Sequence, residues 1–317
     1  MAGSAVTIDH IRAAAGRIAP YVHRTPVLSS RLINAEAGCD ILFKCENLQK
    51  VGAFKARGAH NAVLCFTREE LARGVATHSS GNHAAALALA ASHFGVPAYI
   101  VMPENAPASK VAAVRAYGGA ITFCESTQAA RESTLQDLCA RTGASFIPPY
   151  DHADVIAGQG TTALELAQQL DPAPDFLLTP VGGGGLLAGC AVATRALLPN
   201  TRVIGAEPTG ADDAQRSFRS RQWQPQAAPD TVADGLRTAL GQLNFRLILE
   251  HVEDILCVDD PAIIHATRLV WTRMKLLIEP SAAVGLAVVL QHAQRFAGKR
   301  VAIVLSGGNV DIDKLPW

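Results

Sequence analysis

The sequence predicts an α/β fold of two domains, each a parallel, twisted sheet flanked by helices. Short apolar runs alternate with longer segments whose apolar residues recur at helical spacing, which is typical of parallel sheets covered on both faces. The chain has 317 residues, of which 49% are hydrophobic and 18% are charged. This length and composition suffice for two apolar cores of ordinary size.

The first elements follow from helical spacing and from helix-start and helix-end signals. Apolar residues at helical spacing predict a helix over residues 7–19, which Pro20 ends. We then expect an extended segment over 25–30, a short helix over 30–37, a buried strand over 41–45 and a helix over 56–66. Thr67-Arg68-Glu69-Glu70 matches a capping box and predicts a further short helix.

From Gly74 onwards, strands and helices alternate regularly. We expect strands over 75–79, 98–102, 121–124 and 145–147, separated by helices over 84–94, 109–117 and 127–142. Residues 74–148 are therefore predicted to form a small mobile domain. Residues 1–73 and 149–317 together are predicted to form a large domain.

The second half of the chain repeats the alternation. We expect helices over 161–170, 187–198, 261–276 and 280–296, and strands over 176–181, 203–206, 254–258 and 301–306. The segment 220–229 is rich in Gln, Pro and Ala, which predicts an exposed loop.

Composition argues against several classes of protein. Lys plus Arg and Asp plus Glu both number 28, so no basic excess points to nucleic acid. We expect neither a signal peptide nor a membrane span, because the most apolar stretch, 176–198, is broken by Pro180 and by glycines. Seven cysteines without CxxC spacing indicate reduced thiols in a cytoplasmic protein, with no disulfide framework and no structural zinc.

Lys55 is the first candidate for chemistry. It stands where a predicted strand and turn lead into a helix, among the apolar residues Val51, Ala53 and Phe54. A helix N-terminus and apolar neighbours disfavour an ammonium ion, and a neutral lysine amine can form a Schiff base with a carbonyl compound. The alternative is an ordinary solvated lysine at a helix start.

Two further stretches lie where a predicted strand meets a helix. The run Gly182-Gly183-Gly184-Gly185 can turn its backbone N–H groups toward a phosphate at a helix N-terminus, although a flexible loop is the alternative. Ser79-Ser80-Gly81-Asn82-His83 offers hydroxyls, an amide and an imidazole at one turn. Both stretches and Ser306 follow the carboxyl ends of predicted strands, where ligands bind in such sheets.

Taken together, these motifs resemble the fold-type II pyridoxal-phosphate enzymes, whose architecture is like that of the tryptophan synthase β subunit. Gly-Ala-Phe-Lys, Ser-Ser-Gly-Asn-His, Gly-Gly-Gly-Gly and Ser-Gly-Gly-Asn occur in the family's order. Within the family, the chain is most similar to the branch of serine racemases, serine/threonine dehydratases and 3-hydroxyaspartate ammonia-lyases.

The resemblance implies a set of cofactor contacts. Lys55 would form the Schiff base with pyridoxal 5'-phosphate in the large domain, and Phe54 would pack beside its ring. Gly182, Gly183, Gly184 and Gly185 would hold the phosphate, and Asn82 would bond the ring hydroxyl. Ser306 would face the pyridine nitrogen, and a hydroxyl there suits elimination better than transamination.

The resemblance also implies catalytic and substrate-binding residues. Lys55 would remove the α-proton of the amino acid, and Ser80 would exchange a proton on the opposite face, with a helix N-cap as the alternative for Ser80. The implied substrate-binding residues are Ser79, Ser80, Asn82, His83, Arg131 and Thr238. His83 is not expected to be catalytic, and Glu279 receives no role.

An acidic segment, 207–213, predicts a cation site. Two carboxylates with a backbone carbonyl between them suit a hard cation. The resemblance implies that Glu207, Ala211 and Asp213 bind magnesium, calcium or manganese. The alternative is that Asp212 and Asp213 form the acidic first turn of a helix.

The substrate prediction rests on Arg131, which matches a racemase arginine placed to meet a carboxylate. Thr238 falls where racemases carry a serine that faces the ligand. An acidic β-substituent should be favoured, unless Arg131 is a solvated arginine paired with Glu125 or Glu132.

The leading hypothesis is therefore a dehydratase (ammonia-lyase) that acts on 3-hydroxyaspartate, serine or threonine. A racemase with side dehydratase activity is a second hypothesis. A non-catalytic phosphate- or nucleotide-binding protein is a third. A homodimer is expected from the family.

Overall fold

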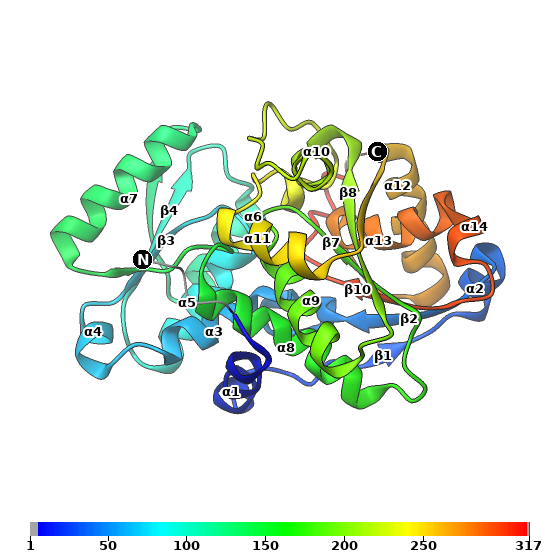
Figure 1. Cartoon of the computed structure of the whole chain (residues 1–317). Helices are drawn as coiled ribbons and strands as arrows, with labels where there is room; N and C mark the ends of the chain where they lie inside the picture. Colours follow the sequence, from blue (N-terminus) through cyan, green and yellow to red (C-terminus); the bar gives the residue numbers. More distant parts are fainter. Residues whose placement is uncertain (1–5, 316) are drawn as a thin grey trace.

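The computed structural model describes residues 6–315 and 317, and its strands form two sheets (Figure 1). The larger sheet has the order β1-β2-β10-β7-β8-β9 and the smaller one β5-β4-β3-β6. Neighbouring strands are parallel except β1 and β2. The larger sheet contains β1 (Val27–Leu28), β2 (Asp40–Cys45), β7 (Phe176–Pro180), β8 (Arg202–Pro208), β9 (Asp254–Val258) and β10 (Arg300–Leu305). The smaller contains β3 (Val75–His78), β4 (Ala98–Pro103), β5 (Ala120–Cys124) and β6 (Ser145–Phe146). The predicted α/β fold with parallel sheets is confirmed.

The helices cover both sheets. They are α1 (Ile8–Ile18), α2 (Arg31–Ala37), α3 (Lys55–Leu64), α4 (Arg68–Ala72), α5 (Asn82–His93), α6 (Ala108–Ala116), α7 (Gln128–Thr142), α8 (Ala153–Gln169), α9 (Gly185–Leu197), α10 (Asp213–Ser220), α11 (Gln242–His251), α12 (Asp260–Leu269), α13 (Pro280–Gln291) and α14 (Ala293–Phe296). The predicted capping box is present: Glu70 N donates to Thr67 Oγ1 at 3.2 Å, and Thr67 N donates to Glu70 Oε2 at 2.8 Å. None of the helices in the described part of the chain combines the length and apolar character that crossing a membrane requires.

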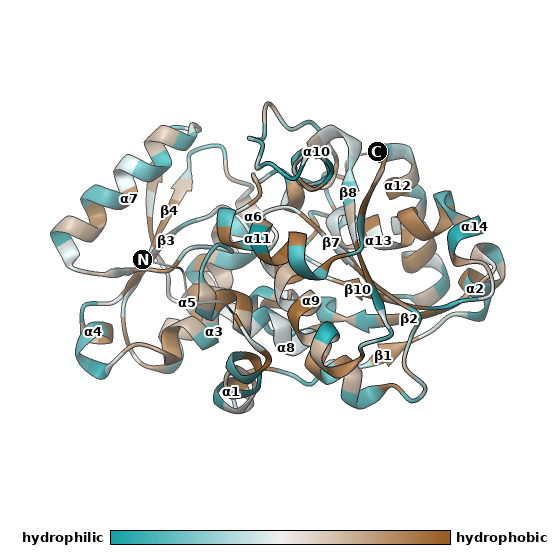
Figure 2. Cartoon of the chain, viewed as in Figure 1, coloured by the Kyte–Doolittle hydropathy of each residue, from teal (hydrophilic) through white to brown (hydrophobic). Residues whose placement is uncertain are grey.

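Alternating residues of the larger sheet feed two cores. On β7, Phe176 and Leu178 face a core shared with α2, α12 and α13, whereas Leu177 faces one shared with α1, α8, α9 and α11. This alternation follows from the two-residue period of a strand. Both faces of the sheet are therefore apolar, and much of its strand ribbon is brown in Figure 2, with teal where polar residues interrupt the apolar runs.

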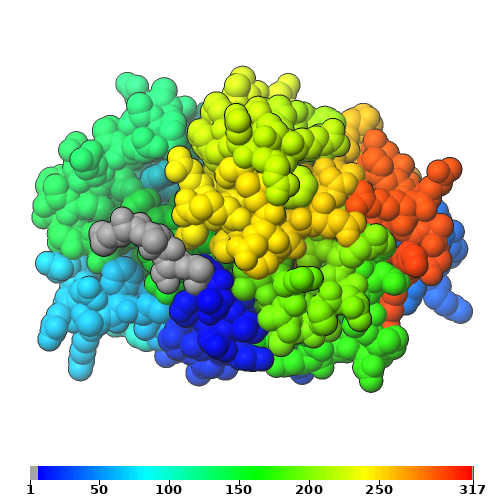
Figure 3. All heavy atoms as spheres, viewed as in Figure 1, coloured from blue at the N-terminus to red at the C-terminus, as the bar shows by residue number. Residues whose placement is uncertain are grey.

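The smaller sheet is also covered on two faces. Helices α3, α5 and α6 share one apolar core with it, and α7 packs on the other face. On the surface shown in Figure 3, α11 (yellow) lies beside the green part of the chain that includes α7. Helix α3 follows β2 of the larger sheet in the chain, but it shares an apolar core with the smaller sheet. This helix therefore joins the two sheets closely. The domain bounds and the mobility of residues 74–148 stay predictions.

Helix α8 begins at Ala153, well before the predicted start at residue 161. Gly158 and Gly160, which weaken helix propensity in the sequence, explain the error. A Cβ on Gly158 would lie 2.6 Å from Gly58 Cα, and one on Gly160 would lie 2.8 Å from Gly189 O. The glycines therefore let α3, α8 and α9 pack closely, and this contact outweighs their poor propensity.

Two other helix predictions differ from the structure, and two further helices were not firmly predicted from the sequence. The predicted helix 261–276 ends at Leu269 and continues as a π-helical turn over Val270–Met274, after which Lys275 has φ +59°. The predicted helix 280–296 is divided at His292 into α13 and α14. Helix α11 was not predicted, and α10 was predicted only as the alternative to a cation site, in which Asp212 and Asp213 form a first turn; both helices are short and α10 is mostly polar.

A buried network of ion pairs joins β2, α3 and α8. The guanidinium of Arg57, fully buried, donates to Glu46 Oε2 at 2.7 Å and Oε1 at 2.8 Å, and to Glu165 Oε1 at 2.7 Å and Oε2 at 2.9 Å. Lys44 Nζ, also buried, donates to Glu165 Oε2 at 2.7 Å and to Thr25 O at 2.8 Å. Two cations thus balance two carboxylates, and bidentate geometry satisfies the guanidinium.

We expect Arg57→Ala to lower the free energy of unfolding by about 3–5 kcal/mol, because it leaves buried carboxylates without their cation. Urea denaturation followed by circular dichroism measures the change. The matched control is Arg12→Ala, since Arg12 pairs with Asp9 on the surface, with both side chains more than half exposed. Such pairs contribute little, so its unfolding midpoint should hardly move. Equal midpoints for the two variants would contradict the prediction.

Candidate active site

Several predicted site residues meet at the carboxyl edges of the two sheets. Ser79 follows β3, Gly182 follows β7 after one residue, and Ser306 follows β10. The loop before Lys55 is joined to the Ser306 loop, because Phe54 N donates to Ser306 O at 3.0 Å and Gly308 N donates to Gly52 O at 2.9 Å. Lys55, the first residue of α3, is therefore held beside the end of β10.

The Lys55 amine lies in a half-buried, largely apolar environment. Its Nζ donates to Pro149 O at 2.6 Å and lies 5.2 Å from the ring centroid of Phe54 and 5.9 Å from that of Tyr150. Burial lowers the pKa of Lys55 to about 8, although the negative charge of Glu279 acts in the opposite direction. The neutral amine that the sequence predicts is therefore accessible near neutral pH.

The glycine run forms a cradle between β7 and α9. Gly184 has φ +90°, and a Cβ on Gly183 would overlap the ring of Tyr150, so both positions require glycine. Gly183 O accepts from Gly241 N at 3.1 Å and from Asn244 Nδ2 at 2.7 Å. Within the described residues, the N–H groups of Gly182 to Gly185 donate to no protein acceptor. Free N–H groups at a helix N-terminus fit a phosphate.

The Ser79–His83 turn is arranged differently from a capped helix start. Gly81 is the N-cap of α5 and forms no side-chain cap, so the alternative of Ser80 as N-cap is wrong. Ser79 Oγ accepts from Gly81 N at 3.3 Å. His83 is buried, its Nε2 bonds Ile147 O at 3.2 Å, and burial first, then the charge of Lys55, lower its pKa to about 3. His83 is therefore a neutral ring beside the site.

Asn82 is tied to two residues from distant parts of the chain. Its Nδ2 donates to Glu279 Oε1 at 3.0 Å, and its Oδ1 accepts from Asn309 Nδ2 at 2.8 Å. Asn309 Nδ2 also donates to Val51 O at 2.7 Å, in the loop before Lys55. Burial raises the pKa of Glu279 to about 7. Glu279, which received no role from the sequence, therefore fixes the orientation of the Asn82 amide.

Arg131 and Thr238 lie at the edges of this arrangement. A Cβ on Gly182 would lie 3.2 Å from Thr238 Oγ1, so Thr238 borders the glycine run. Arg131 lies in the first turn of α7, at the carboxyl edge of the smaller sheet. Its Nε is buried without a hydrogen-bond partner in the described chain, and Glu132 accepts instead from Gln128 Nε2 at 2.6 Å. Among the described residues, Arg131 forms no ion pair with Glu125 or Glu132, so the alternative of a paired arginine is not borne out.

The acidic segment surrounds the start of α10. Glu207 Oε1 accepts from Ala214 N at 2.9 Å and Oε2 from Gln215 N at 2.8 Å, while Asp213 Oδ2 accepts from Leu240 N at 2.7 Å. These contacts fit the alternative in which Asp212 and Asp213 form the acidic start of a helix. Within the described residues no group of three or more His, Cys, Asp or Glu side chains is arranged to hold a metal ion, so a cation here would need the carbonyl of Ala211 as well.

Tyr150 is the site residue that the sequence analysis missed. It lies between Lys55 and Gly183, in the segment that follows β6. The strand-end rule that selected Ser79 and Ser306 could also have selected this position. It was overlooked because β6 is short and no family motif covers it.

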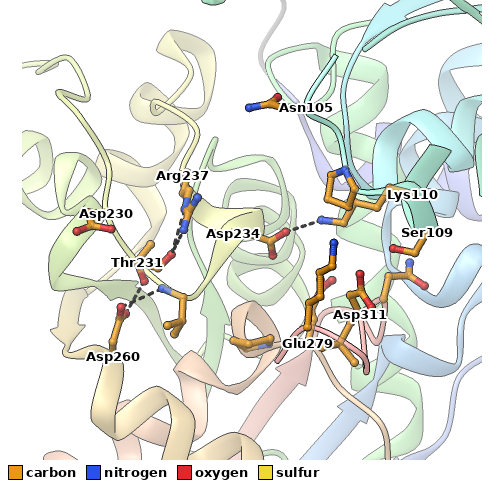
Figure 4. A pocket seen from close by; sticks show the side chains of 16 residues that line it. Asn105, Ser109, Lys110, Asp230, Thr231, Asp234, Arg237, Asp260, Glu279 and Asp311 are labelled. Atoms are coloured by element: carbon orange, nitrogen blue, oxygen red, sulfur yellow. Dashed lines mark hydrogen bonds and ion pairs between the residues drawn. The ribbon is translucent and has the colours of Figure 1, made fainter. Parts of the chain in front are cut away.

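A cavity of about 450 Å³ lies between α6 and the loop before Thr238 (Figure 4). Lys110 and Asp234 point toward each other and form an ion pair at its edge. None of the predicted site residues lines it, although Glu279 does. It shares Glu279 and Asn309 with the contacts that fix Asn82, so it adjoins the arrangement around Lys55.

Comparison with known proteins gives consistent matches. A family model described as "Pyridoxal-phosphate dependent enzyme" matches residues 18–307. The chain is 47% identical to the beta-hydroxyaspartate dehydratase of Paracoccus denitrificans, over 98% of both chains. It is 47% identical to the L-threo-3-hydroxyaspartate ammonia-lyase of Saccharomyces cerevisiae, over 97% of this chain and 94% of that one. The structure of maize serine racemase, 45% identical, superposes with a TM-score of 0.95 over 98% of this chain and 95% of that one.

We expect Lys55 to react as a neutral amine with a pH midpoint near 8, because burial lowers its pKa. Deprotonation increases with pH, so labelling of Lys55 by a brief pulse of acetic anhydride should rise through pH 8 and then level off. Peptide mass spectrometry of the cofactor-free protein measures the profile, and the exposed Lys299 gives the reference. A midpoint that coincides with that of Lys299 would show that burial does not tune Lys55.

Proposed function

The chain belongs to the family of pyridoxal-phosphate-dependent enzymes, and on that premise we propose that it is a dehydratase (ammonia-lyase) of β-hydroxy amino acids. The product is a keto acid with ammonia, and 3-hydroxyaspartate is favoured over serine and threonine. One observation carries this preference: the buried Nε of Arg131 has no partner in the described chain. Two relatives named for reactions of hydroxyaspartate support it.

The residues around Lys55 fit the cofactor. The free N–H groups of Gly182 to Gly185 would hold its phosphate, and Lys55 would form the covalent link. Asn82 keeps one amide N–H beyond the one that Glu279 accepts, and this N–H would meet the ring hydroxyl. Phe54 would pack on the ring, and Ser306 would face its nitrogen. When bound, pyridoxal phosphate supplies the electron withdrawal that acidifies the substrate Cα–H.

Lys55 is the proposed base. Its amine, with a pKa near 8, can take the α-proton onto Nζ near neutral pH. The β-hydroxyl leaves as water together with one proton, which balances the proton that Lys55 removed from the α-carbon, and hydrolysis of the enamine product then consumes one water and releases ammonia and the keto acid. The rings of Phe54 and Tyr150 and the carbonyl of Pro149 hold the amine in position.

Amino-acid racemisation is the second candidate function. It would need a proton donor on the face opposite Lys55, and Ser80 is proposed for this role. Because Ser80 does not cap α5, its hydroxyl is available for proton exchange. The similarity to maize serine racemase supports this candidate. Inverted amino acid among the products would distinguish racemisation from elimination alone.

The proposed selection of an acidic substrate depends on Arg131. Burial of its Nε without a partner in the described residues is unfavourable, and a ligand carboxylate would relieve it through charge-assisted hydrogen bonds. The charge of Arg131 also acts on His78, the last residue of β3, whose pKa is lowered mainly by burial. This coupling supports a position of the guanidinium near Ser79 and Ser80. Thr238 and the Ser79–His83 turn complete the proposed substrate-binding set.

We expect Arg131→Ala to lower kcat/KM for 3-hydroxyaspartate about 10- to 100-fold relative to serine, since a charge-assisted pair is lost. The measurement compares the isomers of 3-hydroxyaspartate with L-serine and L-threonine, and scores keto acid, ammonia and inverted amino acid. Lys55→Ala is the control for loss of catalysis and should inactivate the enzyme on every substrate. An unchanged ratio in Arg131→Ala would contradict its role as selector.

A divalent cation at Glu207, Ala211 and Asp213 is also proposed. Burial raises the pKa of Glu207 well above its usual range and that of Asp213 to about 6. The negative charges of Asp213 and Asp212 add to the effect on Glu207, and that of Asp212 adds to the effect on Asp213. Magnesium, calcium or manganese would offset this buried negative charge. Backbone N–H groups occupy one position on each oxygen of Glu207 and on Asp213 Oδ2, and further lone pairs remain on these oxygens.

We expect saturating magnesium to raise the Tm of chelator-treated enzyme by about 5 °C, because an ion that binds only the folded state stabilises it. Glu207→Gln should remove this increment, whatever its own Tm, because an amide is a weaker cation ligand. The exposed Glu250→Gln variant should retain it. Differential scanning calorimetry measures the increments, and an increment that survives in Glu207→Gln would place the cation elsewhere.

A homodimer in the cytoplasm is also proposed. Leu48 and Leu277 are large apolar side chains that remain exposed, and they lie on adjoining loops because Asn47 Nδ2 donates to Leu277 O at 3.2 Å. An apolar surface of this kind supports contact with a second copy.

A further inference from the structure

Tyr150 separates the Lys55 amine from the glycine run. Its ring centroid lies 5.9 Å from Lys55 Nζ, and its ring occupies the space that a Cβ on Gly183 would fill. The preceding carbonyl, Pro149 O, accepts from the same amine at 2.6 Å. One residue therefore contacts both the proposed base and the proposed phosphate cradle.

The backbone at Tyr150 is fixed by α11. Asn244 Nδ2 donates to Gly183 O at 2.7 Å and to Tyr150 O at 3.3 Å, which holds the two segments together. Asp151 Oδ1 accepts from Leu243 N at 3.0 Å and from Asn244 N at 3.1 Å at the start of that helix. The position of the Tyr150 ring is therefore set by its neighbours before any ligand binds.

The hydroxyl of Tyr150 is a donor that the described protein does not use. The Cγ end of the ring lies at Gly183, so the hydroxyl is at the end remote from the glycine run. No hydrogen bond joins it to the described residues. Burial raises the pKa of Tyr150 to about 12, and Asp151, Asp213 and Glu132 add to this, so the group stays protonated. Glu132, whose charge acts on this hydroxyl, is the neighbour of Arg131 on α7.

We infer that Tyr150 is a specificity-determining residue whose hydroxyl donates to the acidic β-substituent of the substrate and whose ring holds the glycine run beside Lys55. This inference rests on the proposed function, because it requires an amino acid with a second carboxylate. A protonated phenol and a guanidinium can donate to the same carboxylate, and donation to a charged acceptor is stronger than donation to a neutral one. The two residues would thus share the recognition of one group.

The test uses the holoenzyme and two amino acids that lack a β-hydroxyl, L-aspartate and L-alanine. Their Kd values are obtained from the change in cofactor absorption on titration. Tyr150→Phe should weaken L-aspartate about tenfold, since it deletes one hydrogen bond to a charged group, and should leave L-alanine nearly unchanged. The matched control is Tyr21→Phe, because Tyr21 stacks on His60 and His93 outside the site.

A second measurement tests the role of the Tyr150 ring separately from that of its hydroxyl. Tyr150→Ala should weaken retention of the cofactor during dialysis, whereas Tyr150→Phe should retain it as the wild type does. Circular dichroism confirms that each variant is folded. Retention of the cofactor by Tyr150→Ala at the wild-type level would overturn the role of the ring.

The outcomes separate the two proposals. If Tyr150→Phe weakens both amino acids equally, or neither, the role of the hydroxyl is overturned even when Arg131→Ala abolishes the preference for L-aspartate. If Arg131→Ala leaves that preference unchanged, the proposed acidic substrate fails instead. A tenfold selective loss in both variants supports the shared recognition.

Discussion

The buried guanidinium of Arg57 is the constraint on which the active-site geometry depends. It holds two carboxylates through bidentate pairs, one on the segment after β2 and the other on α8. Arg57 lies in the same helical turn as Lys55, and its N–H donates to Phe54 O at 3.0 Å. The start of α3 is therefore anchored by an ion network in which Arg57, Lys44 and Glu46 are fully buried. A lysine amine placed on such a helix start keeps its position when its own hydrogen bond to Pro149 is exchanged for a ligand.

Glycines make the rest of the arrangement possible by letting backbones approach closely. Gly58 and Gly158 allow α3 to lie against α8, and Gly160 and Gly189 allow α8 to lie against α9. Since α3 begins with Lys55 and α9 begins with the last glycine of the run, these crossings set the distance between the amine and the phosphate cradle. Tyr150, on the segment before α8, fills the space between them.

Burial tunes the ionisable groups of the site in one direction. It lowers the pKa of Lys55 and His83 and raises that of Glu279 and Tyr150, so each group moves toward its neutral form. A neutral amine can act as a base, and a protonated phenol can act as a donor. Arg131 differs from these groups, because a guanidinium keeps its charge when buried. The site is therefore suited to proton transfer at one end and to recognition of a negative charge at the other.

Much of this protein could be predicted from its sequence because the signals are local. Apolar spacing predicts the alternation of strands and helices, and the motifs around Lys55, Ser80, Gly182 and Ser306 follow the carboxyl ends of strands, where a parallel sheet places its ligands. Local spacing could not show that Arg57 pairs with Glu165, because that partner is 108 residues away in the chain. Local spacing also predicted too late a start for α8. Gly158 weakens helix propensity in the sequence, and the close packing that it allows exists only where α3 lies against it. Tyr150 belongs to the site because it contacts Gly183, and Glu279 because it accepts a hydrogen bond from Asn82. Such contacts join segments that are distant in the chain, so only the tertiary structure decides them.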